Sequence, residues 1–252
     1  MTNYYVTSFS KLSESLGCKK CQFQRFNEIT QNDYESITQE SYPVDIVEPI
    51  ESDNQASGII IHNILEWVMD DGLPSFQGRV NQVMEAMNDI SEGNFDNTLA
   101  SNFLSGYLPS SIHDARVQRV TSRVVPCMRK LNFLLSKKPP ISIHTEKNLL
   151  YKDKQNSSQI AIIGRADLIL QFEDYVEIVE YKTGNWENEE KWWFQLNGYA
   201  SCLRSKKIKI TIIHPNAGKS REFLGMSFSE HMSNIFSEEC AHSDICENRT
   251  NS

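Results

Sequence analysis

Two carboxylates and a lysine stand on consecutive apolar stretches of this chain, where apolar side chains would be cheaper to bury. Asp167 lies in QIAIIGRADLIL, and Glu180 and Lys182 lie in YVEIVEYK, which follows it. Such charges are costly in a protein interior unless they are paired or bind something. Converging carboxylates repel each other, and a divalent ion such as Mg²⁺ or Mn²⁺ turns that repulsion into coordination. The ion can activate a water, and a neighbouring lysine can orient or deprotonate that water. The three residues therefore predict metal-dependent cleavage of phosphodiesters.

Strands are the elements that must position these residues. Period-two alternation places Glu180 and Lys182 on one face of the expected strand at 175–182. Asp167 comes within reach of them if its strand pairs with theirs as a hairpin. Gly164, on the same strand as Asp167, marks a point where the backbone must approach another group closely. The expected strands are residues 141–151, 160–170 and 175–182, with a polar hairpin turn at 152–158.

A histidine lies at the edge of the apolar stripe of an expected helix upstream. Residues 58–70 read GIIIHNILEWVMD, with Ile61, Ile64 and Val68 in the stripe and His62 beside it. Taken alone, His62 is an ordinary histidine whose polar atoms a neighbour satisfies. Facing the downstream carboxylates, a neutral imidazole is a common metal ligand.

The remaining elements are less distinctive. Residues 71–140 predict a helical insertion, with helices at 76–90 and 114–138, the second bent or broken at Pro126. The other expected elements are a helical segment at 8–26, a polar connection at 27–57, a strand at 206–214, and a final strand and helix within 221–236.

Bulk composition limits the function classes. The net charge of −8 argues against a nonspecific coat for DNA, which would be basic. The segment NAGKS at 216–220 invites comparison with a phosphate-binding loop, but Ile213 stands where that motif needs glycine, so this reading is rejected. We see no signal peptide and no apolar run long enough to cross a membrane, and we therefore expect an intracellular location.

Several short motifs together resemble one known family. GRAD at 164–167, EYKTG at 180–184 and QLNGY at 195–199 occur in the order and at the separations seen in the RecB-like branch of the PD-(D/E)XK nucleases. That branch includes the CRISPR-associated RecB-type exonucleases. GIIIHNILE is similar to its glycine–histidine helix. The resemblance implies an α/β fold with a restriction-endonuclease-like core, in which helices flank a central mixed sheet. The chain would be a single nuclease domain, 1–252, with its catalytic core at 141–215.

The resemblance also implies a role for each matching residue. Lys182 would be the catalytic lysine, Gln195 and Tyr199 would position the scissile strand and that lysine, and Glu146 would be an auxiliary carboxylate. The ligands of Mg²⁺ or Mn²⁺ would be His62, Asp167, Glu180 and the backbone carbonyl of Tyr181.

Contacts to nucleic acid have two candidates. Arg116, Arg119 and Arg123 fall at i, i+3 and i+7 on one helical face, which is either a solvated face or a phosphate-binding surface. Three tryptophans could stack on single-stranded bases or pack in the core, at Trp186, Trp192 and Trp193.

Four of the six cysteines lie near the two ends, as a C-x2-C pair and a C-x5-C pair, at Cys18, Cys21, Cys240 and Cys246. In several RecB-like nucleases, one amino-terminal and three carboxyl-terminal cysteines hold a [4Fe–4S] cluster. Here Ser237 stands where the third carboxyl-terminal cysteine is expected, and Cys18 could supply the fourth thiolate. Residues 1–26 and 237–252 would then form a terminal clamp. A two-plus-two set also suits zinc, and unligated thiols are the third alternative.

The resulting interpretation is a metal-dependent DNA nuclease. By family analogy it is an exonuclease on single-stranded DNA or DNA ends, in DNA repair, recombination or CRISPR adaptation, and it could act with other proteins of those processes. Two alternatives are an endonuclease on RNA or branched DNA, and a non-catalytic nucleic-acid-binding subunit of a larger complex. The intact histidine, aspartate, glutamate and lysine set speaks against the second alternative.

Overall fold

The structure, a computed structural model, describes residues 2–16, 19–39, 53–69, 73–92, 114–155, 157–184, 186–205, 207–222 and 228–236. Its strands are β1 (Asn3–Ser8), β2 (Asn27–Ile29), β3 (Ser142–Gln155), β4 (Ser158–Gln171), β5 (Val176–Tyr181), β6 (Ile208–His214) and β7 (Ala217–Glu222). Its helices are α1 (Phe9–Glu14), α2 (Lys19–Phe23), α3 (Gln31–Gln39), α4 (Asp53–Met69), α5 (Leu73–Ser91), α7 (Asp114–Lys137), the 3-10 turn η1 (Trp186–Asn188), α8 (Glu189–Ser201) and α9 (Phe228–Ile235).

The described strands form one mixed sheet organised around β4. The sheet has seven strands in the order β2-β1-β4-β5-β6-β7, and β3 pairs with β4 off this path. The antiparallel partner β3 follows β4 from Ser158 to Gln171 and so occupies one of its edges throughout. The other edge is shared: β1 pairs in parallel with the first part of β4, and β5 pairs antiparallel with its last part. The interval 164–167 of β4 lies between these two partners.

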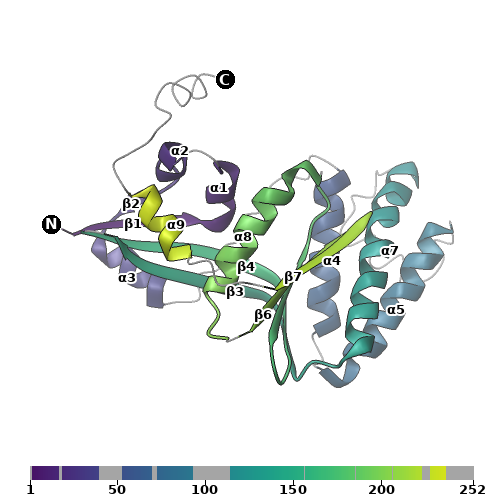
Figure 1. The fold of residues 1–252 in the computed structure, drawn as a ribbon. Coiled ribbons are helices and arrows are strands. Elements are labelled where there is room, and N and C mark those ends of the chain that lie inside the picture. Colours follow the sequence, from purple (N-terminus) through teal and green to yellow (C-terminus); the bar gives the residue numbers. More distant parts are fainter. Residues whose placement is uncertain are drawn as a thin grey trace.

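Two groups of helices cover the sheet, as Figure 1 shows. One group, α4, α5 and α7, packs on a core that contains Ile64, Val83, Met128, Leu168 and Val179. The other group, α1, α8 and α9, packs on a second core that contains Phe9, Ile162, Leu196, Ile210 and Met232. Within the described residues, the segment expected as an insertion therefore supplies part of the main core.

The expected fold class is confirmed. The mixed sheet, its flanking helices and the strands of the 141–215 core are all present. The segment 216–220 continues from the β6–β7 turn into strand β7, so the final strand begins at Ala217 and not within the expected range 221–236. The helix expected at 114–138 runs through Pro126 as one element, α7. In the described part of the chain, no helix has both the length and the apolarity needed to cross a bilayer.

Two local expectations are wrong, and one is confirmed in part. The polar connection at 27–57 contains β2, α3 and the start of α4, and Tyr34 of α3 packs on the Tyr4 ring and donates a hydrogen bond to the Ile160 carbonyl. The helical segment expected at 8–26 is present as two short helices, α1 and α2, and the strand before it, β1, was not expected. The hairpin turn at 152–158 is shorter than expected, because the ladder between β3 and β4 continues to Gln155 and Ser158.

Candidate active site

The two buried carboxylates meet where β4 changes partner. Asp167 is 4% exposed and Glu180 is 3% exposed. The Tyr181 N–H donates to Asp167 Oδ2 at 2.7 Å, and the Asp167 N–H donates to Glu180 Oε2 at 3.4 Å. Each acid is therefore held by the backbone of the other strand, and the hairpin pairing expected from the sequence brings them together.

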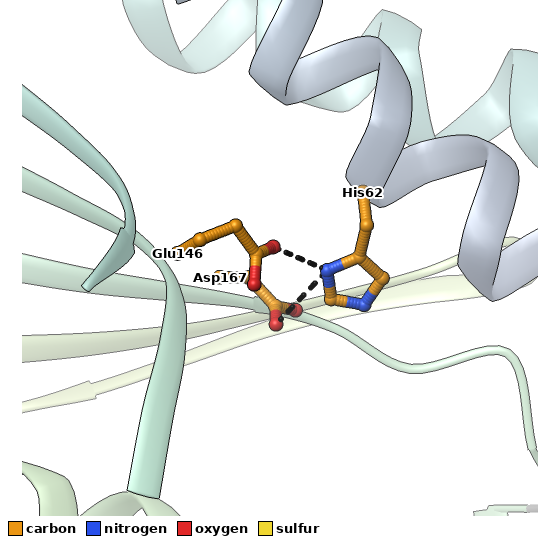
Figure 2. Close-up of side chains that lie close together, drawn as sticks. All are labelled: His62, Glu146 and Asp167. Atoms are coloured by element: carbon orange, nitrogen blue, oxygen red, sulfur yellow. Dashed lines mark hydrogen bonds and ion pairs between the residues drawn. The ribbon is translucent and has the colours of Figure 1, made fainter. Parts of the chain in front are cut away.

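Helix α4 brings a histidine onto the same acids. His62 Nδ1 donates to Glu146 Oε1 at 2.6 Å and lies 3.5 Å from Asp167 Oδ1 (Figure 2). One ligand atom from each of these three residues lies within 4.8 Å of the others. An imidazole nitrogen with carboxylate oxygens suits Mn²⁺ and accommodates Mg²⁺, so these residues fit the expected ion.

Glu146 takes the place in this group that the resemblance gave to Glu180. The carboxylate of Glu180 contacts the Asp167 backbone and Lys182 instead. Glu146 also lies 2.7 Å from Arg165 through its Oε2 and the Arg165 Nε. Its backbone φ is 48°, in the left-handed region that a non-glycine residue adopts at a cost.

The charges of the site are strongly coupled. The negative charge of Asp167 raises the pKa of His62 to about 9, with help from Glu146, although burial works in the opposite direction. Burial and then the charge of Glu180 raise the pKa of Asp167 to about 7, against the opposing effect of His62 and Lys182. The site thus concentrates negative charge in a buried position, and a divalent ion would relieve that repulsion.

A chain of hydrogen bonds extends from Glu180 to the helix α8. Lys182 Nζ donates to Glu180 Oε1 at 2.8 Å and to Gln195 Oε1 at 3.2 Å. Gln195 Nε2 donates to the Tyr199 hydroxyl at 2.6 Å. Burial lowers the pKa of Lys182, but Glu180 and Asp167 outweigh it, and the net pKa is raised. Lys182 is therefore a cation at neutral pH, which suits it to orient water or stabilise a phosphate rather than to remove a proton.

Tight packing fixes the position of Tyr199. A Cβ at Gly164 would lie 2.5 Å from Tyr199 Cε1 and 2.7 Å from Phe9 Cδ2. The expectation that the backbone approaches another group closely at Gly164 is confirmed. The fully buried Phe9 ring also packs edge-on against Tyr199, with the ring centroids 5.3 Å apart.

A cavity of about 400 Å³ opens onto these residues. On one side it is lined by His62, Asp167, Glu180, Gln195 and Tyr199. On the other side it is lined by residues from β1, α1 and β2, among them Ser8, Ser10, Lys11 and Asn27. The sequence reasoning missed this second side, because the serines there were read as helix caps.

The nucleic-acid candidates on α7 and α8 are placed less clearly. Trp192 and Trp193 are 9% and 6% exposed, so core packing, which was the alternative to base stacking, describes both. Arg119 is exposed and Arg123 is half-buried on α7, while the side chain of Arg116 lies outside the described residues. The phosphate-binding face remains a prediction.

The cysteine set lies mostly outside the described residues. Cys21 is half-buried on α2, and Cys18, Cys240 and Cys246 are not among the residues described. Phe236, the last described residue, packs on Phe23 close to Cys21, with ring centroids 5.3 Å apart. The cluster and zinc hypotheses stay predictions.

Comparison with known proteins identifies the family. Residues 39–246 match a family model described as the PD-(D/E)XK nuclease superfamily. The chain belongs to that superfamily. Membership makes metal-dependent hydrolysis of nucleic acid the expected chemistry of this cavity.

Two further comparisons add little. The crystal structure of SSO0001 matches with 16% sequence identity and a TM-score of 0.33, over 59% of this chain and 70% of that chain. No curated protein matches the chain.

Proposed function

We propose that this PD-(D/E)XK protein is a RecB-like, metal-dependent DNA nuclease that acts as an exonuclease on single-stranded DNA or DNA ends. The observation that carries the proposal is the unbroken set of contacts that runs from the His62 imidazole through the buried acids to Lys182, Gln195 and Tyr199. DNA repair, recombination or CRISPR adaptation is the setting that the motifs favour.

The residues divide into two tasks. His62, Glu146 and Asp167 would hold Mg²⁺ or Mn²⁺, with the Tyr181 carbonyl and Glu180 as further candidates. When bound, such an ion supplies a Lewis acid for the phosphate and a water of lowered pKa. Lys182 stays positively charged, so it can orient that water and stabilise charge on the scissile phosphate.

The second task is to position Lys182, and it belongs to Gln195 and Tyr199. The Gln195 side chain accepts a hydrogen bond from Lys182 and donates one to Tyr199. The tightly packed tyrosine therefore holds the Lys182 ammonium group in place through Gln195. Positioning of this kind contributes to catalysis because a small misplacement of a catalytic group is costly in rate. A purely nucleic-acid-binding subunit would have no need of this arrangement.

An end-label assay on linear and circular single-stranded DNA tests the proposal. With Mn²⁺ or Mg²⁺, the wild type should degrade the linear strand and leave the circle intact, and EDTA should abolish cleavage. Glu180→Gln and Lys182→Met should each remove activity, whereas Glu173→Gln, at an exposed acid outside the cavity, should retain it. Cleavage of the circle would favour the endonuclease alternative, and activity surviving both site variants would overturn the site assignment.

We also propose that the terminal cysteines bind a [4Fe–4S] cluster, with a zinc ion as the alternative. The support is the packing of Phe236 on Phe23, which places the chain four residues before Cys240 near the segment of Cys21. Metal analysis of anaerobically purified protein should find iron and acid-labile sulfide, which Cys21→Ser should remove and Cys202→Ser should retain. Zinc without sulfide would replace the cluster by a zinc site. A protein that contains neither iron nor zinc would show that the thiols are unligated.

A further inference from the structure

The amino-terminal segment completes the cavity from outside the catalytic motifs. Strand β1 ends at Ser8, opposite Ile163, and β5 ends at Tyr181, beside Asp167. Because β1 runs parallel to β4 and β5 runs antiparallel to it, the carboxyl ends of both strands reach the interval 164–167. Crevices of this kind, where a sheet changes its strand order, are common ligand sites. The chain before residue 39 lies outside the family match.

The two sides of the cavity differ in chemistry. Among the described lining residues, the carboxylates are Asp167 and Glu180, both on the catalytic side. The other side, which we call the amino-terminal wall, consists of Ser8, Ser10, Lys11 and Asn27 and offers hydroxyl, ammonium and amide donors. None of the described ion pairs engages the exposed Lys11, so its ammonium can meet an anionic ligand.

The wall is held firmly against the catalytic residues. Phe9, between the two serines, is fully buried against Tyr199 and against the backbone at Gly164. Figure 1 shows α1 beside α8, the helix that carries Tyr199. The Ser8 hydroxyl accepts from the Lys11 N–H at 3.3 Å and lies 3.1 Å from the Ser10 hydroxyl. The backbone of the wall is therefore held in place beside the catalytic residues.

We infer that the amino-terminal wall, through Lys11, binds a phosphate of the DNA strand that neighbours the scissile phosphate. This inference rests on the proposed nuclease function. Non-bridging phosphate oxygens take charge-assisted hydrogen bonds from ammonium groups and ordinary ones from hydroxyls. Arg165, which pairs with Glu146, adds a second cation to the lining of the cavity, with its side chain 44% exposed. A cavity of about 400 Å³ lies in the size range of small-molecule sites, so it has room for a short piece of one strand.

Binding of a labelled single-stranded oligonucleotide tests the role of Lys11. In the Glu180→Gln background with Mg²⁺, Lys11→Gln should weaken affinity about 3- to 10-fold and lower the slope of log K against log salt by about 0.7, the value for one phosphate contact on a single strand. Lys11→Arg should retain most of the affinity. The matched control is Lys207→Gln, at an exposed lysine that pairs with Glu222 outside the cavity, and it should change neither quantity.

Steady-state cleavage separates the possible failures. In the otherwise wild-type enzyme, Lys11→Gln should raise KM severalfold and leave kcat within about twofold, as expected for loss of binding shared by the ground and transition states. If the wild type cuts DNA but Lys11→Gln matches it in affinity, salt slope and KM, the inference about the wall is wrong and the nuclease function stands. If the wild type neither binds nor cuts DNA with either ion, the proposed function fails, and the inference fails with it.

Discussion

Gly164 offers a sharp test of how packing and catalysis are joined in this protein. It lies on β4 and faces Tyr199 of α8. A methyl group there would meet Tyr199 Cε1 at 2.5 Å and Phe9 Cδ2 at 2.7 Å. Carbon atoms normally approach to about 3.5–4.0 Å, so at least one ring must move by roughly 1 Å. Both rings are buried, and they pack against each other, so neither moves without disturbing the other.

Two opposing effects decide the stability of Gly164→Ala. Alanine in a strand gains about 0.5–1 kcal/mol over glycine, because glycine loses more backbone entropy on folding. Overpacking a well-packed core costs about 1–3 kcal/mol. The clash wins, and we expect a net loss of about 0.5–2 kcal/mol in the free energy of unfolding. Displacing Tyr199 also loosens its 2.6 Å bond to Gln195, so kcat should fall by about tenfold or more.

Urea denaturation with a matched control measures the effect. Gly78 lies on α5, and a Cβ there would meet nothing within 4 Å. Gly78→Ala should therefore stabilise the protein by about 1 kcal/mol through helix propensity. The same substitution should thus have opposite signs at the two sites. A Gly164→Ala variant as stable and as active as the wild type would refute the packing argument.

Perturbations at four other residues have definite expected outcomes. Lys182→Met should lower kcat by about 10²- to 10⁴-fold. Gln195→Leu removes the hydrogen bonds to Lys182 and to Tyr199 and should lower kcat by about 10²-fold. Both variants should keep the fold, as measured by circular dichroism. Because the pKa of His62 is raised to about 9 in the metal-free site, Mn²⁺ must displace a proton, so its affinity by calorimetry should rise from pH 7 to pH 9. His62→Ala should weaken that affinity at least about tenfold and flatten its pH dependence. Lys130→Met removes donors to three carbonyls at the β6–β7 turn and should cost about 1–3 kcal/mol in urea unfolding.

Local periodicity was enough to predict the strand carboxylates. The alternation that put Glu180 and Lys182 on one face leaves their charged groups 2.8 Å apart. The helical spacing of Gln195 and Tyr199 likewise brings their side chains into contact. These contacts depend only on the geometry of one strand or one helix, which a short stretch of sequence reports directly.

Contacts between distant segments could not be predicted in this way. His62 meets Glu146 across 84 residues, and only the family resemblance suggested that it faces the acids. Strand β1 was missed although its tyrosines, valine and threonine favour a strand, because the segment is short and its pairing with residues 158–163 depends on the whole sheet. The amino-terminal wall of the cavity was missed with it, since its residues acquire a role only through that pairing.

The least predictable feature of the site is a break in the strand alternation at Asp167. Ile162 and Ala166 pack in the core beneath α8, but Leu168 packs in the core beneath α4 and α7, although regular alternation would keep all three on one face. The partner strand β3 keeps its register here, with Thr145 opposite Leu168 and Lys147 opposite Ala166, and the residue between them is Glu146. The distortion is therefore confined to Asp167 on β4 and Glu146 on β3.

The φ of 48° at Glu146 indicates that this distortion is strained. Comparing Glu146→Gly with Glu146→Ala isolates the strain, because both variants lose the carboxylate. In an ordinary strand, alanine is the more stable of the two by about 0.5–1 kcal/mol. A left-handed residue costs any side chain about 1–2 kcal/mol, so at Glu146 glycine should be the more stable by about 1 kcal/mol in urea unfolding.

The same pair of substitutions at Lys147, the exposed next residue, should show the ordinary order, since positive φ among the described non-glycine residues is confined to Glu146. If alanine is the more stable at both positions, the backbone at Glu146 is not strained. If the order inverts at Glu146 alone, stability is given up there to aim a carboxylate at His62, and the strain belongs to the site rather than to the fold.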